Sequence, residues 1–267
     1  MSALAILAAS ELRDAARRRW LWLYGIAYVL LAALAAWGSG GSGFGRAAAS
    51  LIGVNVVVIP LLALVMGALA YARDRERGTL GYLLSLPVTV DQVLAAKALA
   101  LAAILLTTLA AGFALAFGSL AVRDIPVDPA ALSQFAAESI LLAFSMCGLG
   151  LAISTVTVRT PLALGAALGV WLTLIGLGDL GLLATSLATH LGLTALVAAT
   201  MLNPVDAYKI AAVAALNGSI DVLGPGGRLA TDIFGPWLMP VLTLVLCGWL
   251  VIALAVARWS ARRSDAV

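Results

Sequence analysis

Long apolar runs, separated by short charged or turn-forming segments, are the main pattern along this chain. Crossing the hydrocarbon core takes about 20 apolar residues in a helix, and runs of that length predict membrane spans. Six stretches qualify: 21–37, 51–72, 93–122, 130–154, 161–187 and 236–257. The pattern therefore predicts an all-α integral membrane protein in which residues 20–267 form a single six-span transmembrane domain.

Residues 1–19 have a different pattern. Leu4, Leu7, Leu12 and Ala15 recur at helical spacing on one side. No positive charge precedes the short apolar run, and charged residues follow it, which is the reverse of a secretory signal. We expect a cytoplasmic amphipathic elbow helix along the inner leaflet, with a frayed basic tail as the alternative.

The positive residues predict the orientation. With six spans, twelve of the 16 Lys and Arg residues share a face with both termini. These are Arg13, Arg17, Arg18, Arg19, Arg73, Arg75, Arg77, Lys97, Arg159, Arg258, Arg262 and Arg263. By the positive-inside rule, this face is cytoplasmic.

The composition is that of a membrane protein, and it gives no reason to expect a nucleic-acid partner or a metal site. The chain is 63% hydrophobic and 11% charged, with a mean hydropathy of +1.08, far outside the range of soluble domains. The charge count explains the pI near 9.1 without a nucleic-acid partner. Cys147 and Cys247 stand 100 positions apart and His190 is the single histidine, so we expect no metal site.

Residues 73–97 form the charged, turn-bearing segment between the second and third spans. Pro87 breaks a short Leu-rich stretch. Thr89, followed three residues later by Gln92, has the spacing of a capping box at the start of a helix. On the predicted topology, this segment faces the cytosol and is where a cytosolic partner would bind.

Residues 188–235 form a predicted extracytoplasmic region, too long for a simple turn. Asn203 is a predicted N-cap, with Pro204 at the first helical position and Asp206 in the first turn. Tyr208 is expected at the headgroup level. We interpret Asn203, Pro204, Asp206 and Tyr208 as an outer gate or partner-docking element; the alternative is that they only cap and anchor a surface helix.

Glu138 and Asp179 are acidic residues inside predicted spans. Such a residue costs about 2.5 to 3.5 kcal/mol on insertion scales, so both should face the bundle, a subunit interface or a wet cavity. Asp179 could instead lie near the outer headgroups. Gly165 and Gly169, in a G-x-x-x-G, would permit close contact between helices.

Two enzyme signatures bear on whether the chain is itself catalytic. No G-x-x-x-x-G-K-[ST] phosphate loop occurs, so any ATP and Mg must be bound by another chain. The run 176–179 reads Gly-Leu-Gly-Asp, the signature of intramembrane aspartyl proteases, but no Tyr-Asp pair supplies the second carboxylate of such a dyad. We therefore predict no catalytic residue and treat the protease as the weakest alternative.

The segment 73–97 resembles the cytoplasmic coupling segment of ABC-2 type permeases. The matching residues are Glu76, Gly78, Thr79, Leu80, Leu83, Leu84, Ser85, Pro87 and Val88. The resemblance implies a homodimeric permease of a bacterial inner membrane, bound to two copies of a separate ABC ATPase. Leu80 and Leu83, on one face, would then fit a groove on that ATPase. Gly81 and Ala96 depart from the family pattern, where Glu and Gly are common.

A narrower resemblance is to the permeases of the nitrous oxide reductase maturation system. It rests on the segments 11–20, 168–171 with Asp179, and 202–209. It implies a periplasmic accessory protein and a role in assembling the copper-sulfide centre of that reductase. A generic ABC-2 exporter of a lipid-soluble or peptide substrate, and a mechanical transmitter that transports nothing, remain alternatives.

Overall fold

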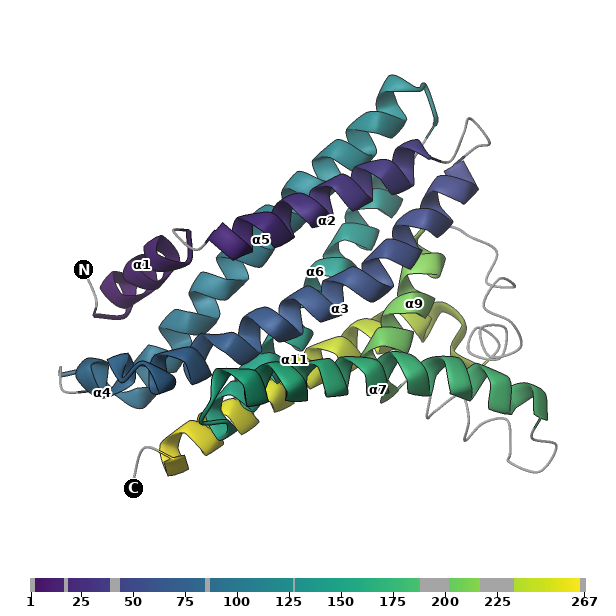
Figure 1. The fold of residues 1–267 in the computed structure, drawn as a ribbon. Coiled ribbons are helices and arrows are strands. Elements are labelled where there is room, and N and C mark those ends of the chain that lie inside the picture. Colours follow the sequence, from purple (N-terminus) through teal and green to yellow (C-terminus); the bar gives the residue numbers. More distant parts are fainter. Residues whose placement is uncertain are drawn as a thin grey trace.

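The structure is a computed structural model that describes residues 3–16, 19–38, 44–84, 87–126, 128–187, 202–216 and 233–264. Its elements are α1 (Ala3–Ala16), α2 (Arg19–Trp37), α3 (Phe44–Glu76), α4 (Thr79–Leu84), α5 (Val90–Val122), α6 (Pro129–Val156), α7 (Thr160–Leu187), α9 (Pro204–Ala215), the 3₁₀ helix η2 (Gly235–Trp237) and α11 (Leu238–Ser264). Figure 1 shows an elongated bundle with both termini and α4 at one end and α9 toward the other.

The all-α prediction is confirmed for the described residues, and each of the six predicted spans lies on a helix. Four of these helical stretches are long and apolar enough to cross a bilayer: Phe44–Glu76, Val90–Val122, Pro129–Val156 and Gly235–Arg263. Gly25–Trp37 and Thr160–Gly176 are shorter apolar helices within the described residues. The count of six spans therefore stays a prediction.

The centre of the bundle is a tight contact between α3 and α6. A Cβ atom at Gly67 would lie 2.3 Å from the carbonyl oxygen of Cys147, and one at Gly150 would lie 2.4 Å from that of Leu64. Both glycines are therefore required for the two backbones to approach each other. Gly165 and Gly169, which would permit close contact between helices, make none within the described chain, since nothing there lies within 4 Å of a Cβ at either position.

The remaining helices pack around this pair. α2 packs on α5, α7 packs on α3, and α11 packs on α6. The short helix α9 contacts α3, α6, α7 and α11, and most of its residues are buried. α1 is helical, as predicted, and packs on α5; its position along the inner leaflet remains a prediction.

Candidate functional site

The first four residues of the segment 73–97 form the last turn of α3, which ends at Glu76. Gly78 has a φ of 71°, a left-handed conformation that favours glycine. The hydroxyl of Thr79 donates to the carbonyl oxygen of Asp74 at 3.1 Å. These contacts turn the chain sharply into α4, which reads TLGYLL.

Leu80 lies inside the chain, whereas we predicted from the sequence that it points outward. Its side chain is 4% exposed and packs with Tyr71 and Val93. It therefore cannot serve as an exposed anchor for another protein, because burial against its own helices uses its apolar surface. The side chains of Leu83 and Leu84, and the whole of Ser85, lie outside the described residues.

The start of α5 is as predicted. Gln92 N donates to the Thr89 hydroxyl at 3.3 Å, and Thr89 N donates to the Gln92 side chain at 3.0 Å. Both halves of the capping box are present. Pro87 and Thr89 are exposed, so this turn is accessible at the end of the bundle.

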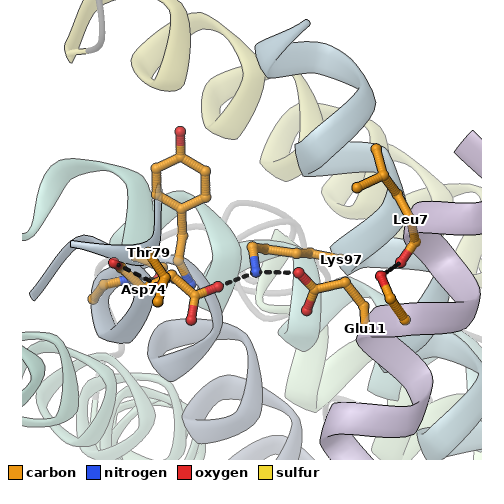
Figure 2. Close-up of polar contacts among 9 residues, drawn as sticks. Leu7, Glu11, Asp74, Thr79 and Lys97 are labelled. Atoms are coloured by element: carbon orange, nitrogen blue, oxygen red, sulfur yellow. Dashed lines mark hydrogen bonds and ion pairs between the residues drawn. The ribbon is translucent and has the colours of Figure 1, made fainter. Parts of the chain in front are cut away.

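An ion triad centred on the buried Lys97 holds this segment to the N-terminal helix. Lys97 is 2% exposed, and its Nζ lies 2.7 Å from Glu11 Oε1 and forms a second ion pair with Asp74. Figure 2 shows Lys97 between the two carboxylates, so that α1, α3 and α5 meet at one cation. We did not predict this triad from the sequence, although a lysine inside an apolar run indicates a buried charge that needs partners.

Two further contacts tie the end of α3 to the end of α6 and to the start of α7. The backbone N–H of Thr160 donates to Glu76 Oε2 at 3.0 Å. Arg75 donates to the carbonyl oxygen of Thr155 at 3.0 Å. The predicted site residue Glu76 is thus positioned at the N-terminus of α7 while staying exposed.

The C-terminal helix α11 contacts the start of α5 at the same end of the bundle. Asp91 accepts from Arg258 at 2.9 and 3.1 Å and also from Arg262. These contacts, with those of Glu11, show that both termini and the segment 73–97 lie at one end of the bundle, as predicted (Figure 1). That this end is cytosolic remains a prediction from the charge count.

The second candidate site is α9, and its local prediction is confirmed. Asn203 accepts from the backbone N–H of Val205 at 3.0 Å, and Pro204 occupies the first turn. The amide of Asn203 also donates to the carbonyl oxygen of Leu174 on α7 at 2.7 Å and to Asp206 at 2.8 Å. Asp206 also pairs with Lys209.

Tyr208 is not at the surface, where we expected it. Its side chain is 0% exposed, and its hydroxyl lies 2.9 Å from Ser139 Oγ and 3.2 Å from the Asn55 amide. Tyr28 donates to Asn55 at 3.2 Å. Burial raises the pKa of Tyr208, so its hydroxyl stays protonated, and this polar network joins α2, α3, α6 and α9.

Glu138 faces the bundle, as predicted, and is 5% exposed. Its Oε1 lies 2.6 Å from Thr243 Oγ1 on α11. Asp179 is on α7, but its side chain lies outside the described residues. The described residues therefore form two polar constellations, an ion-paired one at the end with the termini and a hydroxyl network beside α9.

Comparison with known proteins agrees with this arrangement. A family model described as "ABC-2 family transporter protein" matches residues 5–266. A protein of Pseudomonas aeruginosa described as "Probable ABC transporter permease protein NosY" is 32% identical, over 96% of this chain and 97% of that protein. A protein of Stutzerimonas stutzeri with the same description is 30% identical, over 94% of this chain and 95% of that protein.

Proposed function

The chain belongs to the ABC-2 transporter family and is an ABC transporter permease subunit, and from this premise we propose that ATP hydrolysis by a separate ATPase drives it through residues 73–97. In this proposal the permease acts as a homodimer with two ATPase copies, and those copies bind the ATP and Mg. No residue of this chain then forms or breaks a covalent bond.

The observation that supports this proposal most directly is the anchoring of the segment 73–97. It is tied to α1 through Glu11, to α7 through Glu76 and to α11 through Asp91. A segment held by so many elements cannot move alone. A displacement imposed on α4 is therefore passed to the helix ends around it.

The bundle provides a route from that end to α9. Asp74 and Lys97 join the ends of α3 and α5, and α3 is locked to α6 by the close contact at Gly67 and Gly150. Asn55 and Ser139, on those same two helices, hold Tyr208 of α9. Tilting α3 and α6 would therefore shift α9, and Asn203, Pro204, Asp206 and Tyr208 stay our proposed outer gate or partner-docking element.

The ATPase would contact the exposed part of the segment rather than Leu80. Glu76, Gly78, Thr79, Gly81 and Pro87 are exposed. Gly81 is exposed on α4 beside the buried Leu80, and Pro87 is exposed beyond the end of α4.

We further propose that the transporter acts in nitrous oxide reductase maturation. The support is the similarity to two proteins described as NosY. The partners would include a periplasmic NosD-like protein docked on the outer face. The process served would be assembly of the reductase's copper-sulfide centre.

Two measurements test the two parts of the proposal, the permease role and the maturation role. The native complex is purified through this chain and its subunits are identified, and the reductase is then isolated from cells that lack this chain. We expect an ABC ATPase and a periplasmic partner in the complex, and a reductase without its copper-sulfide absorption. If the complex contains an ATPase but the reductase from cells that lack this chain is fully assembled, the permease role stands and the maturation role is contradicted.

A further inference from the structure

The Thr243 hydroxyl lies between two oxygen atoms, and one of them belongs to the Glu138 carboxyl group. Thr243 Oγ1 lies 2.6 Å from Glu138 Oε1 and 3.0 Å from the carbonyl oxygen of Met239. A hydroxyl group carries one hydrogen, whereas both of these neighbours are acceptors if Glu138 is ionised. If the Thr243 proton points to Met239, the hydrogen between Thr243 and Glu138 must belong to the carboxyl group.

The other carboxyl oxygen points to the same assignment. Among the described residues, Glu138 Oε2 is buried and has no hydrogen-bond partner. An ionised carboxylate with an unpaired buried oxygen is very costly. In a protonated carboxyl group, the unpaired atom is a neutral carbonyl oxygen, for which lack of a partner is better tolerated.

The described surroundings offer no cation to the carboxyl group. From α9, the titratable group that faces it is Tyr208, whose hydroxyl is engaged by Ser139 and Asn55, while Lys209 on the same helix pairs with Asp206. From α11, Thr243 contacts the carboxyl group, and from α3, Asn55 contacts the neighbouring residue Ser139.

Charged residues on the helices around α6 lie elsewhere. Those of α3, α5 and α11 stand within about two turns of the helix ends, and on α7 the side chain of Asp179 is outside the described residues. These residues are Arg46, Arg73, Asp74, Arg75, Glu76, Asp91, Lys97, Arg258, Arg262 and Arg263. Glu138 is the tenth residue of the 28 in α6, well inside the span.

We propose that Glu138 is a proton-binding site within the membrane, at the junction of α6, α9 and α11. The carboxyl group holds the proton on Oε1 and donates a hydrogen bond to Thr243 Oγ1. The Thr243 hydroxyl in turn donates a hydrogen bond to the carbonyl oxygen of Met239. The proton leaves only when these helices separate enough to admit water. A conformational change that opens the junction would therefore release one proton, and closing it would take one up, whatever the cargo.

Infrared spectroscopy of the whole permease in lipid bilayers tests the assignment. The probe is the C=O stretching band of a carboxylic acid, which shifts on exchange into D₂O. We expect this band in the wild-type protein at neutral pH and its loss in Glu138→Gln, which keeps the shape of the neutral acid. Thr243→Val should move the band, because it removes the hydrogen-bond acceptor.

Asp206→Asn is the matched control, since Asp206 is a buried carboxylate that has a cationic partner in Lys209. It should leave the acid band intact and remove carboxylate absorption instead. A wild-type spectrum with no acid band at neutral pH would overturn the proposal without depending on any variant. Loss of carboxylate absorption alone in Glu138→Gln would overturn it as well, because it would show that Glu138 is ionised.

Discussion

Lys97 on α5 is ion-paired with Asp74, 23 residues earlier near the end of α3, and both side chains are buried. Glu11 on α1 completes the triad. Asp91, on the first turn of α5, is also ion-paired, but its arginine partners are more than half exposed. Both clusters join helices at the same end of the bundle, and they differ mainly in how far their side chains are buried.

Burial predicts a large difference between the two clusters. Removing one partner of a buried ion pair typically costs about 3–5 kcal/mol, whereas exposed pairs contribute roughly 0.2–1 kcal/mol. We therefore expect Lys97→Met to lower the midpoint of thermal unfolding in detergent strongly, and Asp91→Asn to lower it slightly.

A triple variant is the control for Lys97. Glu11→Gln and Asp74→Asn remove the two carboxylates that Lys97→Met leaves unpaired, so adding them should recover much of the lost stability. Equal unfolding midpoints for Lys97→Met and Asp91→Asn would show that the triad is not effectively buried.

The burial of Leu80 changes what its mutation should do. Truncating a buried leucine to alanine costs about 2–5 kcal/mol, so Leu80→Ala should lower the stability and abundance of the permease itself. Gly81→Arg adds bulk and a positive charge, opposite to the Glu common at this position in the family, on the exposed side of α4, where a Cβ meets nothing within 4 Å. It should leave the permease folded and weaken ATPase binding.

Quantitative copurification measures this difference. The disruption of an interface anchor commonly costs about 2 kcal/mol or more, and that energy corresponds to about a 30-fold loss of affinity. If Gly81→Arg retains the ATPase at the wild-type ratio, the exposed side of α4 is not the binding surface.

Tyr28→Phe should destabilise the protein more than Tyr208→Phe. The Tyr28 hydroxyl donates to the buried side-chain oxygen of Asn55. When the Tyr208 hydroxyl is removed, the Asn55 amide still donates to Ser139, and Ser139 still donates to the carbonyl oxygen of Phe135. Leaving a buried polar group unsatisfied costs about 1–3 kcal/mol. Thermal unfolding of the two variants, which lose the same atom, checks the ranking.

The gate proposal for α9 needs a functional readout beside stability. Asp206→Asn and Tyr208→Phe are compared at matched abundance for ATP turnover by the assembled complex and for activity of the matured reductase. Altered turnover or maturation supports a gate or docking role. Wild-type values for both variants would reduce α9 to a structural element.

The charge count predicts the orientation of the whole bundle. In a background without Cys147 and Cys247, Ser85→Cys should be protected from an impermeant thiol reagent in intact cells, and Ser219→Cys should react. Permeabilised cells are the control, because both positions should label there. Reaction at position 85 in intact cells would invert the predicted topology.

The sequence by itself determined the helices and where two of them begin. Each of the six apolar runs lies on a helix, because a backbone in lipid must satisfy its hydrogen bonds within the segment. Thr89 with Gln92, and Asn203 with Pro204, start α5 and α9 as predicted. Such caps depend on neighbours within a few residues, so they can be recognised locally.

Only the tertiary structure decided which faces of those helices are buried. Lipid tails are as apolar as leucine, so the hydrophobic pattern does not distinguish a lipid-facing side from a packed one. The burial of Leu80 and Tyr208 was therefore mispredicted from their local context. The contact of Lys97 with Glu11 joins residues 86 positions apart, and no local pattern specifies such a pair, because it forms only once α1 and α5 have packed together.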